Sequence, residues 1–130
     1  MFISALYTAI LALLIIYLSI VVILSRRKNK IAFADGGINE LIVARSAHAN
    51  ATEYIPITLL LMFGLEFNGG HSVLLHLFGV LIVLGRVVHA HGILKEDIRS
   101  RIVGMQLTFS VIIGLALANM TYILMYLFSA

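Results

Sequence analysis

The sequence has no cysteine and little charge, and each shortage excludes a class of protein. Of its 130 residues, 12% are charged and 62% are hydrophobic, with nine Lys and Arg against six Asp and Glu. Soluble domains carry about 25% charged residues, so this chain has too few charges to cover a surface in water. The small net charge of +3, without a basic patch studded with aromatic residues, excludes a nucleic-acid partner. The composition therefore predicts a membrane protein.

The absence of cysteine limits the chemistry that the chain can perform. Without a thiol it forms no disulfide, builds no thiolate metal site and has no sulfur nucleophile. Zinc-protease and nucleotide-binding motifs are also absent, and His89-x-His91 places its two rings on different faces of a helix. We expect no metal site, and any thiol chemistry must use a thiol that arrives on a bound molecule.

Two long uncharged runs are present, Met1 to Ser25 and Ile102 to Ala130. Each exceeds the roughly 20 apolar residues that cross a bilayer core. Nothing basic precedes the first run, which favours a retained helix over a cleaved signal peptide. Between these runs lie two further apolar segments that also contain a few charged and polar residues. The sequence predicts one all-α domain over 1–130, an integral membrane four-helix bundle with helices at about 2–25, 41–67, 73–94 and 102–129.

Basic residues follow the first predicted helix and the third, whereas the middle loop and both termini have none. The positive-inside rule then places the first and third loops in the cytoplasm and both termini outside it. The basic residues concerned are Arg26, Arg27, Lys28, Lys30, Lys95, Arg99 and Arg101.

Charged residues inside membrane helices are costly, and each is a hypothesis for a functional site. At the start of the second helix, Ser46, Asn50 and Glu53 share one stripe by helical spacing. Near the end of the third helix, Arg86 and His89 share a face. Both clusters lie at the end of the bundle with the basic loops. Arg45 and His48 flank the first cluster, and Arg99 and Arg101 open the fourth helix.

Cations outnumber Glu53 in this region, which suits an anionic ligand bearing one amino group. An arginine beside a thiol would also lower the pKa of that thiol. Structural interpretations remain open beside this one. Arg45 can extend to the lipid headgroups, His48 can be a buried structural histidine and Asn50 can join helices. Glu53 and Arg86 can form a structural ion pair, and Glu66 is expected to be solvated.

Three segments carry a family resemblance: HANATEYIP at 48–56, GRVVH at 85–89 and RIVGM at 101–105. Together they resemble the MAPEG family, the membrane-associated proteins in eicosanoid and glutathione metabolism. The loop Asp35-Gly36-Gly37 is similar to that of the short bacterial branch. The resemblance implies a four-helix protomer assembled as a homotrimer in a bacterial inner membrane. It also implies that glutathione binds as cosubstrate between adjacent subunits near the cytoplasmic face.

The resemblance also assigns roles to residues. Asn50, Glu53 and Arg86 would hold glutathione, with Glu53 meeting its amino group. Arg101 would stabilise the thiolate and is the candidate catalytic residue. The remaining candidates for cofactor binding are His48, Arg45, His89, Arg27 and Lys30.

The chain departs from the family pattern at two places. The family commonly has arginine four residues before the asparagine, where this chain has Ser46 and its arginine is Arg45. That shift turns the side chain by about 100° around the helix. Eicosanoid-synthesising relatives carry tyrosines where this chain has His89 and Ile93. The pattern therefore favours general detoxification over eicosanoid synthesis.

The expected function is a membrane-bound, glutathione-dependent transferase or peroxidase that acts on lipophilic electrophiles. Its expected partners are glutathione, a lipophilic small molecule, membrane lipid and further copies of itself. One alternative is a non-catalytic MAPEG-like membrane protein. A less favoured alternative is a small multidrug-type transporter, which would need an essential acidic residue without neighbouring arginines.

Overall fold

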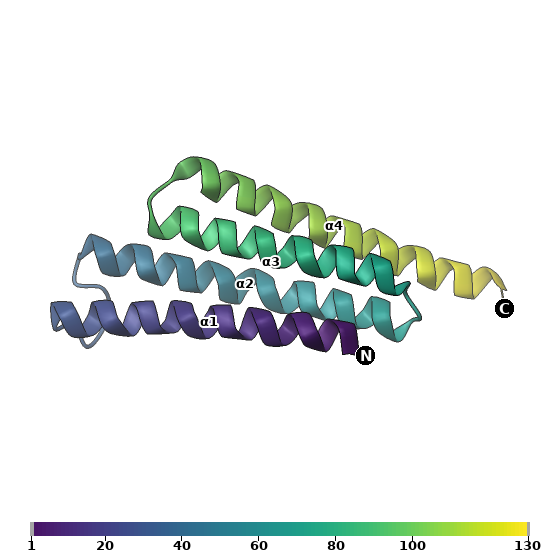
Figure 1. Cartoon of the computed structure of the whole chain (residues 1–130), viewed down its shortest axis with the longest axis horizontal. Helices are drawn as coiled ribbons and strands as arrows, with labels where there is room; N and C mark the ends of the chain where they lie inside the picture. The colour runs from purple at the N-terminus through teal and green to yellow at the C-terminus, as the bar shows by residue number, and fades with distance from the viewer. Residues whose placement is uncertain (1, 130) are drawn as a thin grey trace.

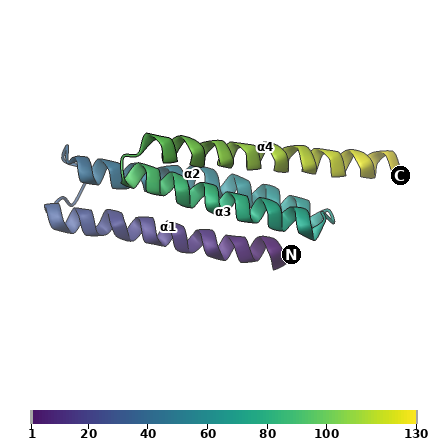
Figure 2. The ribbon, with the colours of Figure 1, turned by 45° about the horizontal axis from the view of Figure 1, so that its top comes forward.

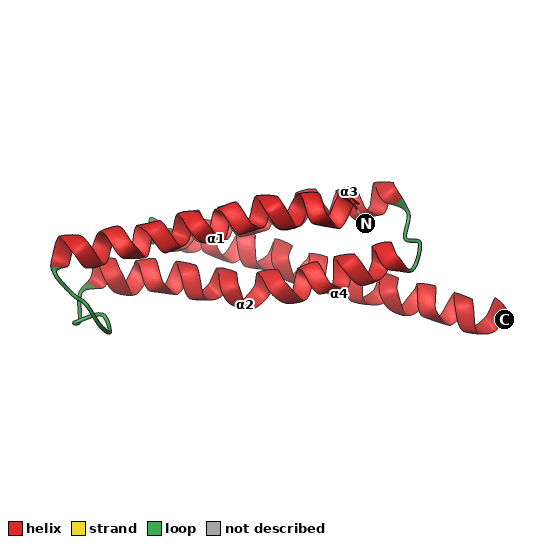
Figure 3. Cartoon of the chain, turned by 90° about the horizontal axis from the view of Figure 1, so that it is seen from below, coloured by secondary structure: helices red, strands yellow, loops and turns green. Residues whose placement is uncertain are grey.

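A computed structural model describes residues 2–129, and within that range the chain forms four helices joined by short loops (Figures 1 and 3). The helices are α1 (Phe2–Asn29), α2 (Asn39–Phe67), α3 (Ser72–Leu94) and α4 (Ile98–Ser129). Successive helices run in opposite directions, so the α1–α2 and α3–α4 loops lie at one end (Figure 1). We name this the loop end. The other, the terminal end, carries both chain termini and the α2–α3 loop. The predicted all-α four-helix architecture is confirmed.

Helix α2 lies in the middle of the bundle, which explains how it carries polar residues. It packs against α1, α3 and α4, whereas α1 packs against α2 and α3 only. Figure 2 shows α1 and α4 on opposite sides. By length and composition, α1, α3 and α4 are apolar enough to cross a membrane. A central helix with neighbours on several sides can bond its polar side chains to those neighbours instead of exposing them to lipid.

At the loop end, α1, α2 and α4 extend beyond the predicted bounds, whereas α3 ends at Leu94 as predicted. α4 begins at Ile98 instead of about 102 because Asp97 caps it. The Asp97 carboxylate accepts hydrogen bonds from the Ser100 hydroxyl (2.6 Å) and the Arg99 N–H (3.1 Å), and these bonds lower the pKa of Asp97. Arg99 and Arg101 consequently lie on the first turns of α4. α1 likewise continues through its basic residues to Asn29, where positive charge favours a helix C-terminus.

Glycines hold α3 and α4 in backbone contact. A Cβ atom on Gly104 would lie 2.4 Å from the backbone nitrogen of His89, and one on Gly92 would lie 2.3 Å from that of Arg101. Neither position accepts a larger residue without separating the helices. The contact therefore fixes the GRVVH and RIVGM segments against each other.

The expectation that Glu66 is merely solvated is wrong. Its carboxylate accepts hydrogen bonds from the backbone N–H groups of Ile3 (3.1 Å) and Ser4 (3.0 Å). These donors have no partner within α1 because they belong to its first turn. Glu66 therefore caps α1 and joins it to the end of α2.

Candidate functional site

Arg86 of α3 is fully buried and joins three helices. Its Nη2 donates to Asn50 Oδ1 of α2 at 2.7 Å, and its Nη1 donates more weakly to Thr108 Oγ1 of α4 at 3.4 Å. The guanidinium carbon lies 5.8 Å from the centre of the Tyr54 ring. Nε has no hydrogen-bond partner within residues 2–129. The sequence prediction that Asn50 and Arg86 lie together is supported by this geometry.

All the partners of Arg86 are neutral. No carboxylate in the described part of the chain forms an ion pair with it. Arginine keeps its proton in proteins, and a buried cation without a counter-charge costs several kcal/mol. Asn50, Thr108 and the face of Tyr54 offset part of this cost. The site consequently retains positive potential that favours an anion beside Asn50.

Glu53 does not pair with Arg86, so the ion-pair interpretation is wrong for the described chain. Its side chain is exposed on the outer face of α2. Asn50 and Tyr54 instead turn toward Arg86, because the helical spacing separates Glu53 from Tyr54 by about 100°. A carboxylate exposed at membrane depth needs a partner. The structure therefore leaves Glu53 available to a ligand or to a neighbouring copy.

The side chain of His89 hydrogen-bonds to the backbone of α4. Its ring is buried, and its Nδ1 lies 2.8 Å from the carbonyl oxygen of Arg101. A carbonyl only accepts, so Nδ1 is the nitrogen that donates in this contact. Nε2 has no partner among the described residues. His89 was predicted to bind cofactor, and the geometry gives it the separate task of positioning the turn that carries Arg101.

The Arg101 side chain is exposed in a groove of about 240 Å³ between α2 and α4. Ser46 of α2 and Gly92 of α3 also line this groove. Ser46 is the position at which related proteins were expected to carry arginine. The groove therefore brings the candidate thiolate-stabilising residue to the same face of α2 as Glu53.

Arg45 pairs with the loop between α1 and α2. Its Nη1 lies 2.9 Å from Asp35 Oδ2, and Asp35 Oδ1 also accepts a hydrogen bond from the N–H of Gly37. Gly36 and Gly37 have φ angles of 59° and 72°, a conformation that glycine adopts without strain. Arg45 thus holds the Asp-Gly-Gly turn beside α2.

The other predicted ligands face different directions. His48 is half-buried and lines a cavity of about 410 Å³ on the α1 side of α2, together with Arg26 and Arg45. Arg27 and Lys30 are exposed and line a hollow of about 390 Å³ at the end of α1. Neither Asn50 nor Arg86 lines this hollow, and the hydrogen bonds of Arg86 within the described chain go to Asn50 and Thr108 instead. One copy of the chain therefore does not gather all the predicted ligands.

Sequence reasoning missed Tyr54 and Thr108 as neighbours of Arg86. Both positions carried a signal. Tyr54 follows Asn50 by four residues and so shares its face, and Thr108 follows Gly104 by four. The Thr108 hydroxyl also donates to the Gly104 carbonyl at 2.9 Å, which leaves its oxygen free to accept from Arg86.

Comparison with known proteins shows the family to which the chain belongs. The sequence model of the MAPEG family matches residues 4–121. The inner membrane protein YecN of Escherichia coli K12 is 38% identical over 120 residues, covering 92% of this chain and 92% of YecN. The protein of the same name from Escherichia coli O6:H1 is similar to the same extent. The family match includes all three segments that surround Arg86 and Arg101.

Proposed function

The chain belongs to the MAPEG family of membrane proteins, and from that premise we propose that it is a glutathione-dependent transferase or peroxidase acting on lipophilic electrophiles. The relatives named above are inner membrane proteins, and we assign the same location to this chain. Its loop end, which carries the basic residues, faces the cytoplasm in this proposal.

The proposal rests on the buried Arg86, whose partners are neutral, together with Glu53, which is exposed on the outer face of α2 and forms no ion pair within the described chain. Glutathione has two carboxylates and one ammonium group at neutral pH. In the proposal, a carboxylate binds on the Asn50 and Arg86 side, where positive potential remains uncompensated. The ammonium group binds Glu53, which follows Asn50 by three residues and is exposed on the next strip of the helix.

A homotrimer completes the site in this account. Glu53 and Arg45 are both exposed on α2, and apolar residues such as Leu60 (67% exposed) lie on the same helix. A surface that mixes apolar side chains with an unpaired carboxylate is poorly suited to lipid. A second copy packed against it would bury the apolar residues and close a glutathione site at the seam.

Arg101 is the proposed activator of the thiol. Its guanidinium lowers the thiol pKa electrostatically, so the proton passes to solvent at the open loop end and the thiolate remains. In the transferase reaction the thiolate sulfur forms a bond to an electrophilic carbon, and the leaving group departs with its bonding electrons. His89 and the glycine contacts keep the first turns of α4 in place, so Arg101 starts from a fixed backbone.

The test compares Arg101→Gln with Arg99→Gln, which removes a cation from the same turn but outside the groove. The parent should conjugate glutathione to a chlorodinitrobenzene, and the ultraviolet absorbance of glutathione thiolate should rise when the protein is added at neutral pH. Arg101→Gln should lower the rate by about 100-fold, as expected for one removed electrostatic stabiliser. Arg99→Gln should retain the rate. A parent without thiolate formation or turnover contradicts the proposal.

One observation favours a second candidate, a non-catalytic MAPEG protein. Arg86 links α2, α3 and α4 through its hydrogen bonds to Asn50 and Thr108, which is the role of a residue that only stabilises helix packing. In that case glutathione would not bind the parent, and Arg86 substitutions would change stability alone. Titration of glutathione into the purified protein separates the two candidates.

A further inference from the structure

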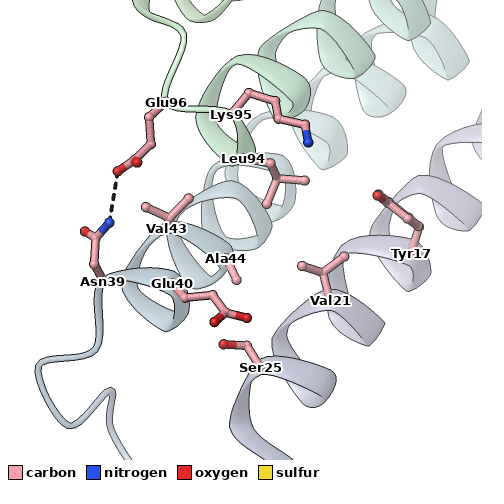
Figure 4. A pocket seen from close by; sticks show the side chains of 10 residues that line it. All are labelled: Tyr17, Val21, Ser25, Asn39, Glu40, Val43, Ala44, Leu94, Lys95 and Glu96. Atoms are coloured by element: carbon pink, nitrogen blue, oxygen red, sulfur yellow. Dashed lines mark hydrogen bonds between the residues drawn. The ribbon is translucent and has the colours of Figure 1, made fainter. Parts of the chain in front are cut away.

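A cavity of about 420 Å³ opens at the loop end (Figure 4), next to the groove that holds Arg101, with which it shares the lining residues Val43 and Glu96. Its walls come from α1, from the start of α2 and from the end of α3. None of the residues assigned above to glutathione lines it. The space exists because α3 ends at Leu94 while α1 continues past it toward the α1–α2 loop (Figure 1).

The cavity presents opposite charges from neighbouring residues. Figure 4 shows Glu96 directed toward Asn39, whose Nδ2 donates to Glu96 Oε1 at 3.1 Å. Lys95 extends the other way, over Leu94 and toward the hydroxyl of Tyr17. Neither Lys95 nor Glu96 forms an ion pair within residues 2–129. The cavity therefore offers an unpaired ammonium on one side and an unpaired carboxylate on the other.

A second carboxylate lies in the same wall, beside a buried hydroxyl. Figure 4 shows Ser25 of α1, which is 3% exposed, facing the carboxylate of Glu40. Glu40 also pairs with Lys28 at 2.8 Å. Ser25 and Lys28 both act on the Glu40 carboxylate and so hold it in the wall of the cavity.

An exposed apolar stripe leads away from the cavity along α1. Tyr17 lines the cavity and is 55% exposed. Leu13, Ile20 and Leu24 are 71%, 47% and 58% exposed and share its face by their spacing. Tyrosine with basic residues nearby is typical of the boundary between headgroups and acyl chains. The stripe is therefore suited to acyl chains whose headgroup occupies the cavity.

We infer that the cavity binds the headgroup of a phospholipid that carries a primary amine, a phosphoethanolamine. The phosphate accepts hydrogen bonds from the Lys95 ammonium and from the hydroxyl of Tyr17. The amine donates to the carboxylates of Glu96 and Glu40. A choline headgroup lacks these N–H donors, and a purely anionic headgroup supplies no cation to Glu96. The acyl chains follow the stripe along α1.

The test titrates delipidated protein in detergent with phospholipids of identical acyl chains and measures dissociation constants by native mass spectrometry. The phosphoethanolamine lipid should bind about tenfold more tightly than the phosphocholine or phosphoglycerol lipid, as expected for charge-assisted hydrogen bonds. Lys95→Met and Glu96→Gln should each weaken its binding by about tenfold. Both side chains are exposed, so these variants should fold.

Two further variants are matched to these. Tyr17→Phe should weaken binding about threefold, because it removes one neutral hydrogen bond. Arg99→Gln removes a cation near the same loop but outside the cavity, and it should bind as the parent does. Equal affinity for the three headgroups, or unchanged binding by both Lys95→Met and Glu96→Gln, would overturn the inference. An equal loss in Arg99→Gln would also overturn it.

The same experiment separates a lipid from a soluble compound of the same chemistry. Glycerophosphoethanolamine carries the headgroup without acyl chains. It should fail to displace the lipid at equal concentration, because it cannot use the apolar stripe. Displacement at equal concentration would assign the cavity to a soluble phosphoethanolamine compound and would reject the lipid.

Discussion

Buried polar groups find hydrogen-bond partners within the chain more completely at the terminal end of the bundle than at the loop end. Near the terminal end, Glu66 caps α1, Tyr7 lies 3.0 Å from His76 Nδ1, and Asn119 donates to two backbone carbonyls. Toward the loop end, Arg86 Nε and His89 Nε2 are buried and have no hydrogen-bond partner within the described chain. The terminal half is mostly satisfied by its own residues, whereas the loop half is suited to bind other molecules.

Gly104→Ala should have the largest effect on stability, because it disrupts the backbone contact between α3 and α4 that positions the residues of the loop half. The added Cβ would meet the His89 backbone at 2.4 Å, whereas the same change at Gly114 meets the edge of the Phe78 ring at 2.7 Å. We expect Gly104→Ala to lower the free energy of unfolding by about 3 kcal/mol and Gly114→Ala by about 1 kcal/mol. Thermal or denaturant unfolding in detergent measures both. Equal losses of stability in the two variants would show that the α3–α4 contact at Gly104 is no more sensitive to an added Cβ atom than the contact at Gly114.

Arg86→Met should weaken glutathione binding by about 100-fold, because it removes the buried charge that attracts the ligand. The side chain is similar in length and can fill the space, so we expect a smaller effect on stability than on binding. Calorimetric titration and thermal unfolding give the two values. A variant that loses stability and keeps glutathione affinity would assign Arg86 a purely structural role.

Glu66→Gln should lower the free energy of unfolding by about 1 kcal/mol, because the amide caps the first turn of α1 less well than the carboxylate. Glutathione conjugation at saturating glutathione should be unchanged, since Glu66 lies at the terminal end. Denaturant unfolding and a rate assay measure the two effects. Unchanged stability would mean that the carboxylate contributes nothing as a cap.

Thr108→Val should have the smallest effect. It removes a weak 3.4 Å acceptor from Arg86 and keeps the shape of the side chain. We expect a loss of about 0.5 kcal/mol in stability and about a twofold loss in glutathione affinity. A large loss, measured by the same unfolding and titration, would show that Arg86 depends on α4 more than the bond length indicates.

The four helices were predictable from the sequence because long uncharged runs and their basic flanks are local signals. The start of α4 was predicted too late, at about 102 instead of Ile98, although Asp97 just before it is a favourable N-cap residue. The sequence indicated that Asn50 and Arg86 lie at the same depth of the bundle, but the contact considered for Arg86 was with Glu53, and its contact with Asn50 was not predicted.

The directions of other side chains were not predictable from the sequence. Helical spacing relates Glu53 to Asn50 on one helix, but it does not fix how α2 is rotated against α3. The rotation depends on packing, including the backbone contact at Gly104, and it turns Asn50 inward and Glu53 outward. The prediction for Glu66 was wrong for a similar reason, because its partners, Ile3 and Ser4, lie on another helix and are distant in sequence.

Calorimetric titration of reduced glutathione into the parent, Glu53→Gln and Glu66→Gln tests the central claim most directly. The same substitution is made in both halves of the molecule, so charge loss alone does not distinguish the variants. The account predicts that Glu53→Gln binds about tenfold more weakly and that Glu66→Gln matches the parent. Equal affinity in all three proteins, or no binding by the parent, would contradict it.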